Sequence, residues 1–527
     1  MIPSVTARRV LSSLHHSQTR PFLRNSLRSN SPRNGLFVIL LTKNSRQKVT
    51  GWNTFFIRLF NKTKGRTMDT IAAICTALSP SGIGIIRVSG EDAITISDKI
   101  FKEANGGKLC DANTHTIHYG HIVDGEEIID EVLVMLMRAP RSYTTEDVVE
   151  IDCHGGILVL KKVFNLLIAN GCRPSEPGEF TKRAFLNGRI DLTSAEAVMD
   201  LISSKSEMAR KNSVSTLRGK MYEKIKSIRE EILFFIAKIE AAIDDPEHMS
   251  LDGFEEELNL KLEGILAEID RLIKSYESGK ILKEGINTAI VGKPNAGKSS
   301  ILNMILDEER AIVTEIKGTT RDTLEESFDI GGLTLNLIDT AGIHESDDLV
   351  EKIGIERAKS AIEKADLVLY VADSSTETDN VDDQIIALID GKKSICLLNK
   401  SDLPREMTKQ ELNAHFEGST TKPVFIYTSA KTGEGKEELF ENIKEMFFAG
   451  EISFNDEVMV SNLRQRNELL IASESLKKVM DSIAASMPED FLSIDLMSAY
   501  AALGEIIGEE VSDDLVDKIF SEFCMGK

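Results

Sequence analysis

The sequence predicts a multidomain protein in which an α+β domain comes first and an α/β domain is inserted into an all-α domain. Its 527 residues suffice for three or four domains at roughly 150 residues each. Short apolar runs alternate with turn residues from about Ile83 to Gly156, and alternating strand and helix patterns fill residues 285–448. Apolar residues at helical spacing lie on both sides of that second segment, which indicates that it interrupts one helical domain.

We expect the N-terminal domain, residues 68–187, to be a small α+β unit. Its apolar runs at Gly84–Val88, Val132–Met137 and Val148–Ile151 are short and bounded by turn residues, as strands are. A longer apolar stretch with helical character follows at Ile157–Ala169.

The helical domain is predicted in two parts, residues 188–284 and 449–527. The first part contains isoleucines spaced by three and four, which place one apolar stripe along a helix: Ile225, Ile228, Ile232, Ile236, Ile239 and Ile243. Helical periodicity also covers Phe254–Ser278 in the first part and Asn462–Phe523 in the second.

Residues 285–448 alternate short apolar strands with helix-length segments, which predicts a doubly wound, mostly parallel sheet. We refer to this segment as the G domain because of the guanine-nucleotide motifs described next. The expected strands are Ile286–Val291, Leu333–Ile338, Leu367–Val371, Ile395–Leu398 and Val424–Thr428.

A phosphate-binding loop follows the first of these strands. The sequence GKPNAGKSS begins at Gly292 and contains Gly297, Lys298 and Ser299 at the spacing of a P-loop. In such a loop backbone N–H groups wrap the phosphates, the Lys298 ammonium reaches the β- and γ-phosphate oxygens, and the Ser299 hydroxyl binds Mg²⁺ at a helix N-terminus. The pattern stands between a strand and a helix, as this chemistry requires.

Three further motifs, each at the end of an expected strand, complete a guanine-nucleotide site. Asp339-Thr340-Ala341-Gly342 supplies a carboxylate for the magnesium shell and an N–H that contacts the γ-phosphate. Asn399-Lys400-Ser401-Asp402 supplies a carboxylate that accepts both N–H groups of the guanine edge, and Ser429-Ala430-Lys431 supports the base. Because a site built for such hydrogen bonds rejects an analogue lacking them by about 10⁴-fold, the pattern predicts GTP rather than ATP.

The hydrolytic machinery differs from that of Ras-like enzymes, which orient the attacking water with a Gln directly after the DxxG glycine. Ile343 occupies that position here. The segment GTTRD, beginning at Gly318, supplies a switch threonine for Mg²⁺, which we assign to Thr320. On residue type alone the water-positioning group is left open among four acids, each of which is equally read as a solvated loop charge: Glu345, Asp347, Asp348 and Glu351.

Charge and cysteine usage limit the function classes. The formal charge of −21 is uneven, because residues 1–68 contain 13 Lys and Arg residues and no acid, whereas residues 69–527 contain 50 basic and 84 acidic residues. A body this acidic repels RNA phosphates, so work on RNA requires a basic partner or a local patch. The six cysteines form no CxxC pair, which favours a reducing compartment over a disulfide framework or a zinc site. Apolar runs are far shorter than the roughly 20 residues of a membrane helix.

The basic, Ser-rich residues 1–67 have two interpretations. Their composition is typical of a mitochondrial transit peptide. Alternatively, they are not part of the native protein, because Met68 begins a segment that reads as the start of a folded domain. We therefore leave them out of the fold prediction.

Taken together, the motifs resemble one family. GKPNAGKSS, GTTRD, DTAG, VEKIGIERA, NKSD and the terminal Cys524-Met525-Gly526-Lys527 are similar to the MnmE (TrmE) tRNA modification GTPases, from Met68 to Lys527. The resemblance implies an N-terminal folate-binding domain, a discontinuous helical domain and an inserted Ras-like G domain. It also implies a potassium-dependent GTPase whose G domains dimerise face to face. The bacterial members begin at the equivalent of Met68, which favours a mistaken start and a cytoplasmic protein; the mitochondrial matrix is the alternative.

The resemblance also assigns roles within the G domain. It implies that Asn295, Thr314, Ile316 and Thr319 hold K⁺ beside the phosphates, in place of an arginine finger, and that Ser299 and Thr320 hold Mg²⁺. Glu351, at the matching place before KIGIERA, would position the attacking water. The GTP-binding set implied in this way is Asn295, Ala296, Gly297, Lys298, Ser299, Ser300, Thr314, Glu315, Ile316, Lys317, Gly318, Thr319, Thr320, Asp339, Thr340, Ala341, Gly342, Asn399, Lys400, Ser401, Asp402, Ser429, Ala430 and Lys431.

The family's reaction adds a carboxymethylaminomethyl-type group to C5 of the wobble uridine, position 34, of certain tRNAs. The resemblance implies a homodimer that forms a heterotetramer with an FAD protein of the MnmG (GidA) type. FAD belongs to that partner, which also contacts most of the tRNA, and no membrane is involved. The one-carbon unit comes from 5-formyl- or 5,10-methylene-tetrahydrofolate.

The positions that match the family's folate contacts are Arg87, Glu150, Arg189 and Lys527. On residue type alone each is more often a surface or ion-pair residue, and Arg189 replaces the Lys of other members, which keeps the charge but changes hydrogen-bond geometry. Cys524 either presents a thiol toward the folate site or is a small buried apolar residue.

Two classes of function remain in competition at this point. The first is an enzyme subunit for GTP-driven tRNA modification, and the second is a regulatory or ribosome-assembly GTPase switch with the same core motifs. Folate binding by residues 68–190 would favour the first, and co-sedimentation with ribosomal subunits would favour the second.

Overall fold

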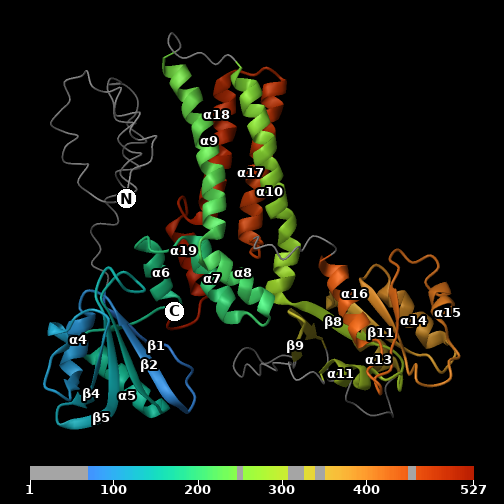
Figure 1. Cartoon of the computed structure of the whole chain (residues 1–527), viewed down its shortest axis with the longest axis horizontal. Coiled ribbons are helices and arrows are strands. Elements are labelled where there is room, and N and C mark those ends of the chain that lie inside the picture. The colour runs from blue at the N-terminus through green and yellow to red at the C-terminus, as the bar shows by residue number, and fades with distance from the viewer. Residues whose placement is uncertain (1–68, 246–252, 307–325, 339–350, 449–457) are drawn as a thin grey trace. The chain divides into compact units, whose positions relative to one another are not determined.

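The computed structural model describes residues 69–245, 253–306, 326–338, 351–448 and 458–527 (Figure 1). Side chains are described for these residues except Glu326 and residues 351–357. Among the described residues, no helix combines the length and the hydrophobicity that crossing a membrane requires.

A seven-stranded sheet organises the N-terminal domain, in the order β3-β4-β5-β6-β2-β1-β7. Neighbouring strands are antiparallel, except for the parallel pair β1 and β7. The strands are β1 (Ile71–Ile74), β2 (Ser81–Ser89), β3 (Phe101–Glu103), β4 (Thr116–Asp124), β5 (Glu127–Met137), β6 (Val148–Gly155) and β7 (Arg173–Pro174).

Two helices share the core of this sheet, α4 (Ala93–Ile100) and α5 (Ile157–Ala169). Residues such as Ile96 and Leu160 pack against β-strand residues such as Val134, all of them buried. The three strands and the one helix expected from the sequence are confirmed. Strand β4 escaped prediction because its alternation includes His118 and other polar residues rather than a continuous apolar run.

One core joins the two sequence halves of the helical domain. Buried residues of α9, α10, α17 and α18, for example Ile228, Ile265, Leu476 and Leu496, belong to the same hydrophobic cluster, and these four long helices run alongside one another in Figure 1. The helices of this part are α6 (Glu179–Leu186), α7 (Leu192–Ser203), α8 (Glu207–Leu217), α9 (Lys220–Asp244), α10 (Phe254–Glu284), α17 (Leu463–Ala484), α18 (Glu489–Ile507) and α19 (Asp513–Ser521).

The isoleucine stripe of α9 is buried with one exception. Ile225, Ile228, Ile232, Ile236 and Ile239 are at most 3% exposed, but Ile243 is 50% exposed. Ile243 lies in the last turn of α9, past the end of the shared core, so this member of the apolar stripe does not contribute to the core.

The G domain contains a six-stranded sheet in the order β13-β12-β11-β8-β10-β9, parallel except for the antiparallel pair β9 and β10. All five expected strands are confirmed, and β9 is an addition that its charged and polar residues concealed. The strands are β8 (Ile286–Val291), β9 (Glu326–Ile330), β10 (Leu333–Leu337), β11 (Leu367–Asp373), β12 (Ser394–Asn399) and β13 (Val424–Tyr427).

Helices pack on this sheet, with separate hydrophobic clusters for its two faces. They are α11 (Lys298–Leu306), α13 (Glu351–Lys364), α14 (Asn380–Ile389), α15 (Lys409–Ala414) and α16 (Lys436–Phe448). Together the three parts confirm the expected fold class: a multidomain α+β protein with a discontinuous helical domain and an inserted α/β domain.

Candidate functional site

The P-loop connects the central strand β8 to helix α11, which begins at Lys298. Asn295 in this loop adopts a left-handed backbone conformation with φ of 62°. The Lys298 ammonium donates to the backbone carbonyl oxygens of Gly292 at 3.0 Å and Lys293 at 2.8 Å. The lysine therefore lies across the loop whose N–H groups would enclose phosphates, at the carboxyl edge of the parallel strands where ligands bind in such sheets.

Asn399 at the end of β12 joins three of the predicted motifs. Its side chain is buried; the amide nitrogen donates to the Ala296 carbonyl oxygen at 2.9 Å, and the amide oxygen accepts from the Ala430 N–H at 3.2 Å. The P-loop, the NKSD motif and the SAK motif are therefore held together by one side chain, although about 100 residues separate the first two in sequence.

Asp402, the carboxylate predicted to select guanine, is also fixed by a neighbouring motif. Asp402 is exposed, and its Oδ1 accepts from the hydroxyl of buried Ser429 at 2.8 Å. This bond orients the carboxylate at the surface, as reading a base edge requires. The Lys400 ammonium contacts the Asp373 carboxylate at the end of β11 at 2.6 Å. Burial alone would raise the pKa of Asp373, but the contact with Lys400 and the hydrogen bonds from Ser375 hold this pKa below its ordinary value.

A charged cluster beside the P-loop was missed at the sequence level. The Lys293 ammonium contacts Asp382 at 2.7 Å and Asp379 at 3.1 Å, and buried Asp382 also accepts from the Tyr370 hydroxyl at 2.6 Å. Burial opposes the charged form of Lys293, but its bonds to Asp382 and Asp379 raise its pKa above the ordinary value. This cluster fastens the P-loop to the start of α14, and the only sequence signal for it was a lysine inside the loop.

The switch residues lie outside the described part of the chain. Only the backbone of Glu351, the first residue of α13, is described. Asn295 and Ser299 are therefore the described members of the K⁺ and Mg²⁺ sets, and the described ranges hold no cluster of three His, Cys, Asp or Glu side chains that could hold a metal. The predicted residues outside are Thr314, Glu315, Ile316, Lys317, Gly318, Thr319, Thr320, Asp339, Thr340, Ala341, Gly342, Ile343, Glu345, Asp347 and Asp348.

A second cluster forms where the C-terminal residues meet the N-terminal domain. Arg87 on β2 and Glu150 on β6 stand directly opposite in register and form an ion pair with Nε and Oε1 2.6 Å apart. Arg189 donates to the Tyr143 carbonyl oxygen at 2.9 Å, and its Cζ lies 4.8 Å from the centre of the Tyr143 ring. The Cζ of Arg87 lies 5.6 Å from the same ring. Tyr143, which sequence reasoning missed, thus brings Arg87 and Arg189 together.

The terminal segment lies against the end of β1. The carbonyl oxygen of Gly526 accepts from the Cys75 thiol at 3.2 Å and from Arg87 at 3.5 Å. Gly526 has φ of 82°, and a Cβ there would lie 2.9 Å from the Cys75 Cα, so the motif requires glycine at this position. Burial raises the pKa of the Cys75 thiol, against opposing contributions from Arg87 and Lys527.

Cys524 stands at the start of this segment, and its carbonyl oxygen accepts from the Gly178 N–H at 3.2 Å. Its side chain is exposed, so the reading of Cys524 as a small buried apolar residue was wrong. The segment ends at Lys527, which is half-buried. The structure thus places the chain end within the same cluster as Arg87.

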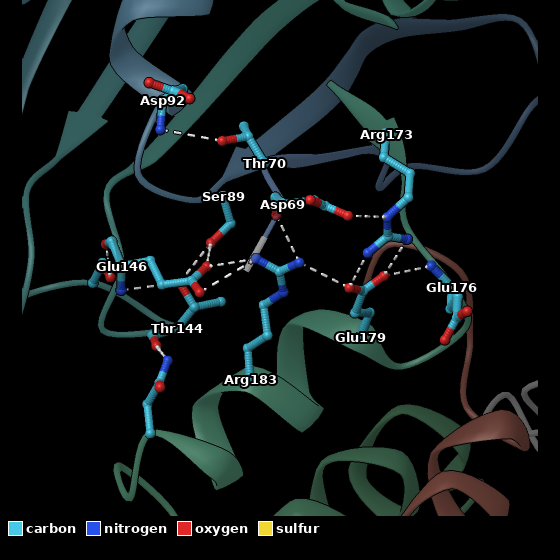
Figure 2. Close-up of polar contacts among 12 residues, drawn as sticks. Asp69, Thr70, Ser89, Asp92, Thr144, Glu146, Arg173, Glu176, Glu179 and Arg183 are labelled. Carbon is cyan, nitrogen blue, oxygen red and sulfur yellow. Dashed lines mark hydrogen bonds and ion pairs between the residues drawn. The ribbon is translucent and has the colours of Figure 1, made fainter. Parts of the chain in front are cut away.

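Figure 2 shows the buried charge network that supports this cluster. Arg183, 2% exposed, contacts Glu146 at 3.1 Å and Glu179 at 2.9 Å and donates to the Asp69 carbonyl oxygen at 2.8 Å. Asn187 donates to the Thr144 carbonyl oxygen at 2.7 Å. Thr144 and Glu146 follow Tyr143 within three residues, so the network holds the C-terminal side of the loop between β5 and β6 that carries the aromatic ring.

Comparison with known proteins covers nearly the whole described chain. Residues 70–189 match the family model "GTP-binding protein TrmE N-terminus", and residues 192–524 match the model "MnmE helical domain". The "tRNA modification GTPase MnmE" of Lachnoclostridium phytofermentans is 54% identical over 460 residues, which are 87% of this chain and 99% of that protein. The protein of the same name from Lactobacillus acidophilus is 47% identical over 461 residues, 87% of this chain and 98% of its own.

Among solved structures, the G domain of the T. maritima FeoB iron transporter is 30% identical over 30% of this chain and 97% of its own. Its TM-score is 0.21.

Proposed function

The chain belongs to the MnmE family of tRNA modification GTPases, and from this premise we propose that it is a K⁺-dependent GTPase that acts with an FAD-containing partner. The reaction adds a carboxymethylaminomethyl-type group to C5 of the wobble uridine of certain tRNAs, with a one-carbon unit from a tetrahydrofolate. The single observation that carries the proposal is the presence, in one chain, of a guanine-nucleotide site joined by Asn399 and of the Arg87–Glu150–Arg189 cluster at the chain end.

The chain is a GTP hydrolase. Asp402, oriented by Ser429, accepts the two N–H groups of guanine, and Asn399 holds the loop that surrounds the phosphates. The Lys298 ammonium exchanges the carbonyl oxygens of its own loop for phosphate oxygens when the nucleotide enters. Mg²⁺ held by Ser299 and Thr320, and K⁺ held by Asn295 with Thr314, Ile316 and Thr319, would neutralise charge that develops between the β- and γ-phosphates.

Glu351 positions the attacking water in this proposal. The start of α13 places its backbone at the end of the segment that follows the DxxG motif, and the Ile343 side chain has no polar group that could orient the water. Face-to-face dimerisation of two G domains would order the segments that carry the K⁺ set. A monomer would therefore bind GTP but hydrolyse it slowly.

The residues at the chain end fit a flat, anionic heteroaromatic ligand. Arg87 and Arg189 present two guanidinium groups beside the Tyr143 ring. A guanidinium group can stack on a planar ring and can bind one carboxylate through two hydrogen bonds. Glu150, fixed by Arg87, offers carboxylate oxygens to ring N–H donors. A tetrahydrofolate bound here supplies the one-carbon unit, Lys527 adds a further cation, and exposed Cys524 lies at the edge of the site.

The partners follow from charge and family. Residues 69–527 carry 50 basic and 84 acidic side chains, so most of the tRNA-binding surface belongs to an MnmG-type flavoprotein, which contributes the FAD. We propose a homodimer of this chain in a heterotetramer with that partner, in the cytoplasm. The match of residues 70–189 to the TrmE N-terminus favours this function over the ribosome-assembly alternative.

The GTPase part is tested by measuring hydrolysis in K⁺ and in Na⁺, with wild-type chain and with Glu351→Ala and Glu345→Ala. We expect the rate to fall by about 10²-fold or more in Na⁺ and in Glu351→Ala, because each removes a group that acts in the transition state. Both variants should bind GTP about as tightly as the wild-type chain, and Glu345→Ala should hydrolyse it at close to the wild-type rate. Rates indifferent to the cation and to Glu351 would refute the mechanism.

A further inference from the structure

Both chain connections between the helical domain and the G domain are fastened to one helix, α7. Lys283 lies in the last turn of α10, directly before β8, and Ser461 lies where the chain returns from the G domain. The Asp200 carboxylate on α7 contacts the Lys283 ammonium at 2.8 Å and accepts from the Ser461 hydroxyl at 3.2 Å. One side chain therefore holds the entering and the returning segment.

A second carboxylate, one turn earlier on α7, holds the returning segment more extensively. Glu196 is 8% exposed and accepts from Asn462 at 2.9 Å, from two nitrogens of Arg464 at 3.0 Å and from Gln465 at 2.7 Å. Glu196 and Asp200 are spaced four residues apart and so share one face of the helix. A buried carboxylate with this many donors forms a rigid contact.

The neighbouring elements strengthen the same attachment. Asn212 on α8 pairs its amide with the backbone of Met459, at 3.0 Å and 3.3 Å. Gly279 on α10 allows the returning backbone to approach closely, since a Cβ there would lie 2.1 Å from the Val460 carbonyl oxygen. Lys205, just after α7, donates to Ser327 on β9 of the G domain at 3.1 Å.

The other end of α7 leads to the folate-site residues. Asp191 caps the helix by accepting from the Ser194 N–H at 3.1 Å, and Arg189 stands two residues before it. Leu192 and Ala195 pack with Phe520 and Phe523 around α19, immediately before Cys524 and the terminal segment. The nine residue steps from Asp191 to Asp200 correspond to about 14 Å along the helix axis.

The helix has room to move on that side. A cavity of about 430 Å³ lies in the helical domain, lined by α7 residues including Glu196 and Asp200, by Lys283 and Arg464, and by Lys518 and Phe523 at the α19 end. The contacts of α7 with α8, α9 and α18 limit its displacement on those sides, whereas on the side of this open depression the helix borders unfilled volume.

We infer that Glu196 and Asp200 are positioning residues that couple the nucleotide state of the G domain to the folate-site residues through rigid movement of α7. A change in the angle at which the G domain is held acts first on Lys283 and on Ser461–Gln465. The two carboxylates transmit this change to α7. Arg189 lies just before the N-terminus of α7, and the apolar face of the helix packs against Phe520 and Phe523, which precede Cys524. The inference rests on the proposed function, because it assigns a role to coupling between its two sites.

The test uses the full chain with its flavoprotein partner, tRNA, GTP, 5,10-methylene-tetrahydrofolate as the source of the methylene carbon and glycine as the source of the carboxymethylamino group. Modified uridine and hydrolysed GTP are measured in the same reaction. For Asp200→Asn we expect GTP hydrolysis close to wild type and about tenfold less modified uridine per GTP. The matched control is Glu257→Gln, which breaks the ion pair between Lys238 on α9 and Glu257 on α10, 2.7 Å long in the same domain. In this control the ratio of modified uridine to hydrolysed GTP should equal that of the wild-type chain.

A charge exchange separates coupling from mere loss of stability. Asp200→Lys should lower the ratio, and Asp200→Lys combined with Lys283→Asp should recover part of it at an equal unfolding temperature. An unchanged ratio in Asp200→Asn, or no recovery in the exchange, overturns the inference. If the wild-type chain itself hydrolyses GTP but modifies no tRNA, the proposed function fails instead, so the two failures are distinguishable.

Discussion

The nucleotide site of the G domain and the proposed folate site, formed by Arg87, Glu150, Arg189 and the chain end, are built in opposite ways. In the G domain, contiguous motifs stand at the ends of parallel strands, and much of the binding surface is backbone held by Asn399. The proposed folate site is assembled from groups on distant segments, including the Arg87 side chain and the Gly526 carbonyl oxygen, 439 residues apart. The first site therefore follows from local sequence, while the second exists only when the N-terminal domain and the chain end are packed together.

This difference predicts that the two sites fail separately. A change within the G-domain motifs should abolish nucleotide recognition and leave folate binding intact. A change in the loop, the buried network or the chain end should have the reverse effect. The following substitutions test that separation from the largest expected effect to the smallest.

Asp402→Asn should reduce GTP affinity by about 10⁴-fold, because the amide cannot accept both guanine N–H groups. The same variant should gain affinity for xanthosine triphosphate, whose C2 carbonyl accepts from the amide. Nucleotide titration measures both, and 5-formyl-tetrahydrofolate binding should be unaltered. Equal loss of folate binding would contradict the separation of the sites.

Gly526→Ala should weaken binding of 5-formyl-tetrahydrofolate by roughly 10- to 100-fold. The added Cβ forces a residue with φ of 82° into contact with Cys75, and strain of this kind costs about 1–3 kcal/mol. Met525→Ala is the matched control, because Met525 is 59% exposed. Calorimetric titration of both variants, with GTP hydrolysis as the second readout, decides whether the terminal segment belongs to the ligand site.

Tyr143→Leu should weaken binding of 5-formyl-tetrahydrofolate by about tenfold, because it removes the ring that Arg87 and Arg189 contact. Each of these cation–π contacts contributes about 0.5–1 kcal/mol. Tyr143→Phe retains the ring and loses only the hydroxyl contact to Thr181 at 2.9 Å, so its affinity should be close to wild type. If both variants bind folate equally well, Tyr143 has no part in positioning the arginines.

The smallest effect concerns acid stability of the buried network. Burial raises the pKa of Glu179, but bonds from Arg173, the Glu176 N–H and Arg183 outweigh it and hold the pKa below the ordinary value of 4.5. The stabilisation is therefore complete above pH 4.5 and is lost as the pH falls through the lower folded-state value. Glu179→Gln should flatten the decrease of unfolding temperature below pH 4.5. An identical pH profile for wild type and variant would show that the network does not depend on this charge.

The two sites also differ in how far sequence reasoning reached. Strong apolar runs predicted five of the described G-domain strands. The P-loop, the NKSD motif and the SAK motif lie together because parallel strands share a carboxyl edge. Strand β9 was not predicted, because its pairing with β10 and not its own composition makes it a strand. Ile243 had the right spacing but lies beyond the end of the core.

For the N-terminal domain, the sequence predicted strands β2, β5 and β6 and helix α5, but not the other elements of the described sheet or the contacts between them. Only the family resemblance pointed to Arg87, Glu150, Arg189 and Lys527. Tyr143 carried no signal, because its role depends on two arginines from other segments and on a loop held by Arg183. Lys293 was similarly hidden, since its partner Asp382 is fixed by tertiary packing rather than by proximity in the chain.

The central claim, that this chain is the GTPase subunit of a wobble-uridine modification enzyme, is tested most directly by nucleoside analysis of tRNA. A strain lacking the chain should lose the C5 modification at position 34. Wild-type chain should restore it, and Asp402→Asn should not. An unchanged nucleoside profile in the strain without the chain would contradict the claim.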